Sequence, residues 1–379
     1  MLHEKRRKRV LLYLGKFPGY GFDVDGGSIM ARQLIDTLKV YTKLDVVFIR
    51  KNKETYEDQH VHDIRYVEYI DAFNNKFSRR LKNLNTNIEA VGDYSVYDII
   101  ITAHVSKFFG FEKAPHDFWD RTILFPMFCT SSYQQAGENV PPCYTQMESY
   151  VINNVRKIIT PSKAECLRLI EDYHCNSNKI SIIPRGINPR FTAPKKHTFS
   201  QTCKLVYIGS IKPQKNNLDA VKLLNMLNKR GHSYELHLVG TIQDKSIYEN
   251  ILAYITKNNL GESIFFHIGV SQSELASLLK QMDFNISVSN WETFGRGIYE
   301  GISSGLPTFV FDRLKVVLDL CDDNPGVTFC KDLSDMRNRI EEIAFSYEKY
   351  KQARSQLHLI ADKVSYLTER KRLLREILI

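Results

Sequence analysis

The chain has 379 residues, of which 43% are hydrophobic and 25% charged, and its formal net charge is +9. A single hydrophobic core stops growing near roughly 250–300 residues, so this length predicts two domains. No apolar run approaches the ~20 residues that a membrane-spanning helix needs, and Val10–Leu14 is too short for a signal-peptide core. Seven scattered cysteines without a C-x-x-C pair argue against a zinc site or a disulfide framework, so we expect a cytoplasmic protein.

Most of the excess positive charge lies in residues 1–200. A basic half would suit an anionic membrane surface, a nucleic acid or an acidic substrate, although a plain solvated surface explains it equally well. The chain carries no recognisable nucleic-acid-binding motif and no alternation of aromatic and basic residues along a strand. We therefore expect no nucleic-acid partner.

Strand-like apolar segments alternate with helical patterns along the whole chain. In chain order, the strands are predicted at 9–15, 44–50, 64–70, 97–103, 122–129, 157–161, 179–184, 204–209, 234–240, 264–269, 284–289 and 308–311. Helical patterns include 29–40, 218–227 and 273–279. This alternation predicts an α/β fold with parallel sheets and right-handed crossovers.

A proline-containing and polar stretch at 188–202 interrupts this alternation. We therefore expect an N-terminal domain over 1–190 and a C-terminal domain over 203–354. A long helical tail, rich in Lys, Arg and Leu, is predicted from about residue 347 to 379.

The most informative segment is 290–307, where Glu292 and Glu300 stand eight positions apart with Phe294 and Gly295 between them. It follows one predicted strand and precedes another. Ligands of open α/β sheets bind outside the carboxyl ends of the strands, and helix N-termini there attract phosphate. Carboxylates beside them can accept hydrogen bonds from ligand hydroxyls, so the segment predicts a site for a sugar with a phosphate.

Two further loops follow the first strand of each predicted domain. The N-terminal one contains Gly26 and Gly27 before a helix, and glycines allow a ligand to approach the backbone closely. The C-terminal one contains Gly209, Lys212 and Lys215, and a lysine there can neutralise a phosphate. Taken alone, an ordinary turn and an ordinary surface loop are the more common interpretations.

Together these loops and the two-glutamate segment resemble the retaining glycosyltransferases of family 4. The resemblance is strongest in the C-terminal half, and in the N-terminal half it includes Gly26-Gly27, the strand ending at His104, and the segment 183–187. It implies the GT-B fold, with two Rossmann-like domains facing each other across a cleft. It also implies a C-terminal crossover helix, about 355–379, that packs back on the N-terminal domain.

The resemblance assigns roles to the C-terminal residues. Glu292 would lie by the hydroxyls of the donor sugar, and Glu300 would bind the ribose hydroxyls. Lys215 would stabilise the leaving diphosphate, which the backbone of Phe294 and Gly295 would also contact.

In the N-terminal half, Gly27, with Gly26 beside it, would approach the phosphate from the opposite domain. The family usually has an arginine directly after the glycine of the first C-terminal loop, where this chain has Ser210. One positive charge is therefore missing unless Lys212 or Arg185 supplies it. His104 is a candidate catalytic histidine, and a structural histidine at a strand end is the equal alternative.

Two segments of the N-terminal half have less specific patterns. Residues 130–142 are polar and are expected to form a flexible acceptor loop or an ordinary surface loop. Residues 73–88 place apolar side chains on one helical face with lysines and arginines elsewhere, which predicts an amphipathic helix. Such a helix could lie on an anionic membrane, although it more often faces a core.

We therefore expect a retaining glycosyltransferase that moves a hexose or N-acetylhexosamine from a nucleoside-diphosphate sugar, with UDP as the expected nucleotide. The acceptor would carry a hydroxyl group, in a cell-surface glycan, a glycolipid or a small molecule. No cofactor or metal is expected, since members of the resembling family commonly work without one. A non-catalytic subunit that binds nucleotide sugars is the alternative.

Overall fold

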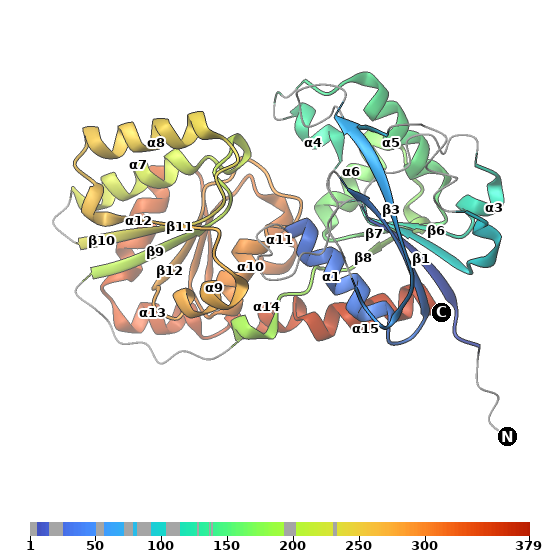
Figure 1. Ribbon diagram of the computed structural model, residues 1–379. Coiled ribbons are helices and arrows are strands. Elements are labelled where there is room, and N and C mark those ends of the chain that lie inside the picture. The colour runs from blue at the N-terminus through green and yellow to red at the C-terminus, as the bar shows by residue number, and fades with distance from the viewer. Residues whose placement is uncertain are drawn as a thin grey trace. The chain divides into compact units, whose positions relative to one another are not determined.

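The computed structural model describes residues 6–14, 26–50, 57–71, 79–81, 92–103, 114–126, 129–135, 137, 139–192, 202–229 and 233–379. Contacts divide these residues into two compact domains (Figure 1). The first contains the described residues up to Ile183 together with 370–379, and the second contains 184–369.

The N-terminal domain is built on a sheet with the order β4-β3-β2-β1-β5-β6-β7-β8. Neighbouring strands are parallel, except that β4 runs antiparallel to β3. The strands are β1 (Arg9–Leu14), β2 (Lys43–Arg50), β3 (Val61–Asp71), β4 (Arg79–Leu81), β5 (Ile99–Thr102), β6 (Thr122–Leu124), β7 (Lys157–Thr160) and β8 (Ile180–Ile182).

The helices of this domain cover both faces of its sheet. They are α1 (Gly26–Leu38), α3 (His116–Trp119), α4 (Thr130–Gln135), α5 (Pro142–Asn154), α6 (Lys163–Tyr173) and most of α15 (Tyr366–Leu378), with short 3-10 turns at Tyr94–Val96 and Ser177–Lys179. The central strand β1 explains this arrangement, because Val10 and Leu12 enter one core while Leu11 and Tyr13 enter the other. A parallel strand buried on both faces needs helices on both sides.

The C-terminal domain has an entirely parallel sheet with the order β11-β10-β9-β12-β13-β14. Its strands are β9 (Thr202–Ile208), β10 (Ser233–Gly240), β11 (Ile264–Ile268), β12 (Phe284–Ser287), β13 (Thr308–Phe311) and β14 (Val327–Cys330). Its helices are α7 (Asn217–Asn228), α8 (Lys245–Lys257), α9 (Gln272–Leu279), α10 (Arg296–Ser303), α11 (Lys315–Cys321), α12 (Leu333–Ala344), α13 (Tyr347–Arg354) and α14 (Leu357–Lys363), with 3-10 turns at Pro189–Thr192, Pro213–Lys215 and Gly261–Ser263.

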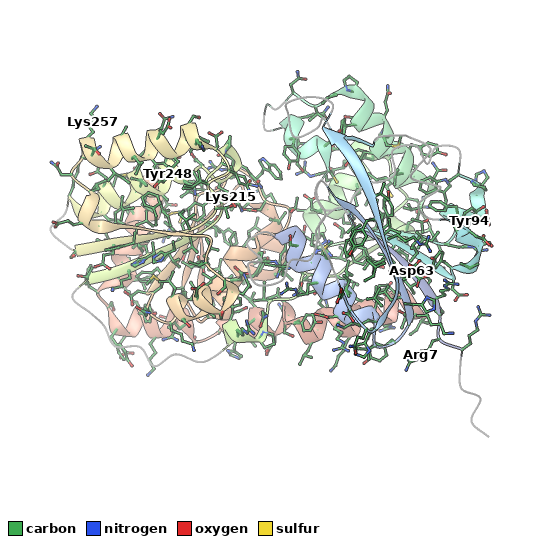
Figure 2. The ribbon with its side chains drawn as sticks, viewed as in Figure 1. Arg7, Asp63, Tyr94, Lys215, Tyr248 and Lys257 are labelled. Atoms are coloured by element: carbon green, nitrogen blue, oxygen red, sulfur yellow. The ribbon has the colours of Figure 1, made fainter. Side chains whose placement is uncertain are left out.

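One hydrophobic core joins the C-terminal sheet to α7, α8 and α12. Figure 1 shows α7 and α8 side by side along the strands. These helices run antiparallel to the strands. The loops that follow the strands therefore all lie at one edge of the sheet. Figure 2 shows Lys215, after β9, at the opposite end of this domain from Lys257, the last residue of α8. Both domains are Rossmann-like, which confirms the predicted α/β fold class.

All twelve predicted strands are present, and the structure adds β4 and β14. The prediction of an amphipathic helix over 73–88 is wrong at Arg79–Leu81, because those residues pair with β3 as strand β4. Pairing with a long neighbouring strand can override a local helical pattern. The other residues of that segment lie outside the described part of the chain.

The predicted helical tail consists of three helices, α13, α14 and α15, and is not one continuous helix. The break before α15 has a tertiary cause. Ile187 N donates a hydrogen bond to Val364 O at 2.7 Å, and Tyr366 N donates one to Ile187 O at 3.1 Å. This strand-like bridge takes the backbone groups that a continuous helix would use. Further along α15, Leu373 and Ile377 are buried in the core of the N-terminal domain.

The predicted flexible loop over 130–142 is wrong in its first half, where Thr130–Gln135 forms α4. The strand predicted over 122–129 ends at Leu124. The buried Glu148 explains the helix position, because it accepts hydrogen bonds from Thr130 N at 2.7 Å and from the hydroxyls of Thr130 and Tyr173. Burial raises the pKa of Glu148, and these hydrogen bonds oppose the increase.

Candidate functional site

The two predicted C-terminal loops meet at the carboxyl ends of β9 and β12. Asn290 N donates to Gln214 O at 2.9 Å, and Gln214 Nε2 donates to Trp291 O at 3.0 Å. These contacts fasten the loop of Lys215 to the loop of Glu292. The structure therefore brings together two segments that lie far apart in the sequence, at the edge where ligands of such sheets bind.

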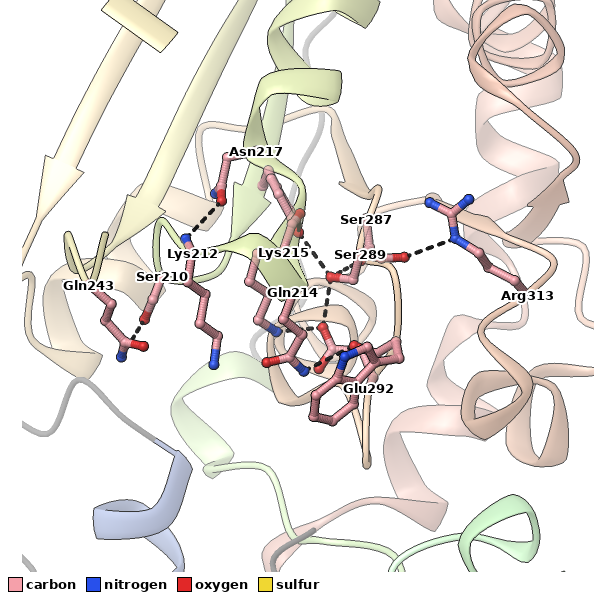
Figure 3. A network of polar contacts seen from close by, with 12 residues as sticks. Ser210, Lys212, Gln214, Lys215, Asn217, Gln243, Ser287, Ser289, Glu292 and Arg313 are labelled. Atoms are coloured by element: carbon pink, nitrogen blue, oxygen red, sulfur yellow. Dashed lines mark hydrogen bonds and ion pairs between the residues drawn. The ribbon is translucent and has the colours of Figure 1, made fainter. Parts of the chain in front are cut away.

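Lys215 and Glu292 form a direct ion pair between Nζ and Oε1 (Figure 3). The side chain of Lys215 is 16% exposed and that of Glu292 is 7% exposed, so water screens the pair only in part. The same Glu292 oxygen accepts a hydrogen bond from Ser289 Oγ at 2.8 Å. Glu292 is therefore a fixed carboxylate, and its side chain is not free on the surface.

Gly209 makes room for the lysine of this pair. A Cβ atom at Gly209 would lie 3.1 Å from Lys215 Cδ, so the aliphatic part of Lys215 passes directly over the end of β9. Lys212 belongs to the same loop, and its backbone N–H faces Asn217 Oδ1 at 3.4 Å (Figure 3). The structure thus places all three predicted loop residues next to the site.

Glu300 lies in the first turns of α10 and is 3% exposed. Burial raises its pKa, while the charge of Arg296, a hydrogen bond from Gln272 and the charge of Lys215 oppose that increase. Lys215 therefore acts electrostatically on both predicted glutamates.

Small residues allow α10 to begin against the sheet. Gly295 has φ 81°, a left-handed conformation that favours glycine, and it is the N-cap of α10. A Cβ atom at Gly297 would lie 2.5 Å from Ile208 O. The first turn of the helix therefore starts directly at the end of β9, where its N–H groups can face an anion. Phe294 anchors this turn by stacking on Tyr299, with ring centroids 4.5 Å apart.

Ser210, where the resembling family has arginine, faces a neighbouring loop. Its Oγ lies 3.0 Å from Thr241 Oγ1, and Gln243 Nε2 donates to it at 3.4 Å. Arg185 is buried, and burial lowers its pKa to about 10, while the charge of Glu369 opposes this decrease. Arg185 thus has an internal counter-ion, which weakens its candidacy as the replacement phosphate ligand.

The predicted N-terminal site residues lie in the other domain or outside the described residues. Gly26 and Gly27 are the first two residues of α1, and a Cβ atom at Gly26 would meet nothing within 4 Å. His104 lies outside the described part of the chain. The structure therefore leaves their proposed roles as predictions.

Sequence reasoning missed two residues that hold the ion pair in place, Tyr207 and Ser289. The Tyr207 hydroxyl donates to Lys215 O and lies 2.9 Å from Ser289 Oγ. A signal was available, because Tyr207 places a polar group two residues before Gly209 in an apolar strand. It did not reveal which groups the hydroxyl would reach.

Residues 190–358 match the family model described as Glycosyl transferases group 1. This match makes the C-terminal domain similar to glycosyl transferases group 1. A curated relative, the MMP alpha-(1->4)-mannosyltransferase of Mycolicibacterium hassiacum, is 24% identical over 170 residues. That match covers 43% of this chain and 39% of the relative, so the chain matches well under half of the relative's length.

Two solved structures share the fold over nearly the whole chain. Sucrose-phosphate synthase from Thermosynechococcus elongatus has a TM-score of 0.80 at 16% identity, covering 98% of this chain and 99% of its own. HepE from Anabaena, crystallised with UDP and glucose, has a TM-score of 0.75 at 14% identity, covering 98% and 100%. At these identities the likeness establishes the fold alone, which is GT-B.

Every helix among the described residues is too short or too polar to span a lipid bilayer. Within the same residues, no cluster of three or more His, Cys, Asp or Glu side chains could hold a metal ion.

Proposed function

We propose that this protein is a glycosyltransferase that moves a hexose or N-acetylhexosamine from a nucleoside-diphosphate sugar to a hydroxyl acceptor, with retention of configuration. The observation that carries the proposal is the grouping of Lys215, Glu292 and Glu300 beside the N-terminus of α10. One cation, one helix terminus and two carboxylates match the chemistry of a diphosphate joined to two hydroxyl-rich groups.

In this proposal the diphosphate binds between Lys215 and the backbone of Phe294 and Gly295. Positive charge there stabilises the leaving group as it becomes free, which is the role of an oxyanion site. Glu300 binds the ribose hydroxyls and Glu292 contacts the transferred sugar. Retention rests on the family 4 resemblance.

UDP is the nucleotide that we propose for the donor. The support is indirect, since HepE, which shares the fold, was crystallised with UDP and glucose. A thermal-shift screen of UDP, GDP and ADP with their sugars tests this choice. A ligand at 100 times its Kd should add roughly 2.7 kcal/mol of stability, which gives a measurable shift.

Transfer itself is tested with the purified full chain and the donor that the screen selects. Release of the nucleoside diphosphate, with and without candidate acceptors, measures hydrolysis and transfer, and proton NMR of the new linkage reports its anomeric configuration. An inverted product would overturn the retaining mechanism while leaving the transferase assignment intact.

The proposal uses no metal, since Lys215 and the α10 terminus supply the positive charge. Activity should therefore survive EDTA at a concentration that removes Mg²⁺ and Mn²⁺. Loss of activity with EDTA and its recovery on adding Mn²⁺ would contradict this part of the proposal.

The acceptor is proposed to be a cell-surface glycan or a glycolipid, with a small molecule as the alternative. The basic N-terminal half would suit a cytoplasmic protein that touches an anionic membrane from the inside. Vesicle sedimentation with and without anionic lipid tests this contact. Binding that does not depend on lipid charge would contradict the proposed membrane contact.

A second candidate function is a non-catalytic subunit that binds nucleotide sugars. The observation in its favour is Ser210, which is bonded to Thr241 and brings no charge to the position where the resembling family has arginine. Tight donor binding without hydrolysis or transfer would support this candidate over the first.

A further inference from the structure

The hydroxyls of Tyr207 and Ser289 connect the two halves of the candidate site. Tyr207 lies on β9 and is 1% exposed, and Ser289 follows β12 and is fully buried. Buried hydroxyls need hydrogen-bond partners, and the ones that these two find belong to the site. They reach Lys215 O and Glu292 Oε1 as well as each other.

The direction of these hydrogen bonds follows from the donors available. The Glu292 carboxylate can only accept, so Ser289 donates its single proton to it. The single proton of Tyr207 goes to Lys215 O, because a carbonyl oxygen can only accept, and Ser289 Oγ accepts from Ser287 Oγ at 3.3 Å. Burial raises the pKa of Tyr207, so the tyrosine keeps that proton at neutral pH. Tyr207 therefore fixes the backbone of Lys215, Ser289 fixes the carboxylate of Glu292, and the two hydroxyl oxygens lie 2.9 Å apart.

Lys215 and Ser289 hold the same oxygen of Glu292. A diphosphate arriving at Lys215 competes with Glu292 for the ammonium group. When Lys215 turns toward phosphate, Glu292 loses its cation but keeps the hydrogen bond from Ser289. The hydroxyl pair thus matters most in the donor-bound state.

We propose that Tyr207 and Ser289 are positioning residues that hold Glu292 against the donor sugar after Lys215 has engaged the diphosphate. This inference rests on the proposed function, because it assigns the sugar to Glu292 and the phosphate to Lys215. It predicts that loss of the Ser289 hydroxyl weakens recognition of the sugar and leaves recognition of the nucleoside diphosphate unchanged.

The chain offers a matched control for each hydroxyl. Among the described residues, the buried hydroxyls of Tyr234 and Ser303 have no hydrogen-bond partner. Tyr234 lies on β10, next to β9, and is as buried as Tyr207. Tyr234→Phe and Ser303→Ala therefore remove the same atoms as Tyr207→Phe and Ser289→Ala without breaking a bond of the network.

The experiment measures the Kd of UDP and of the best UDP-sugar by calorimetry, and kcat for transfer or donor hydrolysis. It uses the wild type, the four single variants and the Tyr207→Phe/Ser289→Ala double variant. Ser289→Ala should leave the Kd of UDP within about twofold, weaken the UDP-sugar at least threefold and lower kcat at least fivefold. Tyr207→Phe should also weaken UDP-sugar binding and lower kcat. The double variant should lose less than the product of the single losses, because the two hydroxyls are in direct contact. The two controls should stay within about twofold of the wild type.

Equal weakening of UDP and UDP-sugar in Ser289→Ala would indicate a general defect of the loop and would overturn the inference. Losses of UDP-sugar affinity and kcat no larger than those of the two control variants would also overturn it. A wild-type protein that binds UDP-sugar but neither transfers nor hydrolyses it would refute the proposed function instead. The ratio of the two Kd values would still decide whether Ser289 positions Glu292.

Discussion

Arg296 Nη1 donates a hydrogen bond to the carbonyl oxygen of Gly186 at 3.0 Å, which ties the first residue of α10 to the segment after β8. Glu369, at the start of α15, interacts electrostatically with both Arg185 and Arg296. A Cβ atom at Gly186 would lie 2.6 Å from Glu369 Oε2, so only glycine lets the carboxylate approach this closely. Two arginines and one glutamate thus form a charge cluster at the start of α10.

Glu369→Ala should lower the free energy of unfolding by about 3 kcal/mol or more, because it removes the carboxylate that acts on the buried Arg185 and one of the two that act on Arg296. Glu376→Ala on the same helix is the control. Glu376 pairs with Lys157 on the surface, where its side chain is 30% exposed, and such pairs contribute about 1 kcal/mol or less. Calorimetric unfolding of both variants makes the comparison, and equal losses would contradict the role of Glu369.

Lys215→Ala and Glu292→Ala should each reduce turnover at least about tenfold, equivalent to some 1.4 kcal/mol of barrier or more. In the proposed mechanism, the first removes the cation at the leaving diphosphate and the second removes the carboxylate at the sugar. Lys222→Ala provides the control, because Lys222 pairs with Asp219 on α7 with a side chain 42% exposed. A near wild-type rate in either variant would exclude that residue from the mechanism.

The same residues show how far the sequence could predict this site. The spacing of Glu292 and Glu300 at a predicted strand end indicates a site, and the resemblance to family 4 adds Lys215. Tyr207 and Ser289 could not be identified in this way, because their contact joins the ends of two strands that lie far apart in the sequence. Among the elements, strands buried on both faces were predictable from apolar runs. The short strand β14 and the break before α15 depend on tertiary pairing, with β13 and with Ile187 respectively.

Gly301→Ala should destabilise the C-terminal domain by about 1–3 kcal/mol through overpacking. The new Cβ atom would lie 2.4 Å from both Cγ and Nδ2 of Asn285, a side chain that is 1% exposed and donates to Ile298 O at 3.2 Å. Gly261→Ala is the control, because a Cβ atom there meets nothing within 4 Å. We expect its thermal midpoint to stay close to that of the wild type, and an equal loss in both variants would argue against the clash with Asn285.

A histidine pair on β10 and β11 should make the C-terminal domain less stable in mild acid. His237 Nδ1 lies 2.9 Å from His267 Nε2, and the His237 ring also stacks on Phe265. Burial, and then the charge of His267, lower the pKa of His237 to about 4, while Glu235 opposes the decrease. Burial also lowers the pKa of His267.

The loss of stability in acid follows from a difference in proton binding between the unfolded and the folded chain. An unfolded histidine has a pKa near about 6.5, so between this value and about 4 the unfolded chain binds more protons than the folded one. The stabilising contribution is therefore complete above pH 6.5 and is lost as the pH falls toward 4. Between pH 7.5 and 5.0 we expect the thermal midpoint of the wild type to fall by roughly 5 °C more than that of His237→Phe. The control is His358→Gln, at an exposed position on α14, which should keep the wild-type dependence of the thermal midpoint on pH. If His237→Phe also keeps that dependence, another group causes the acid sensitivity.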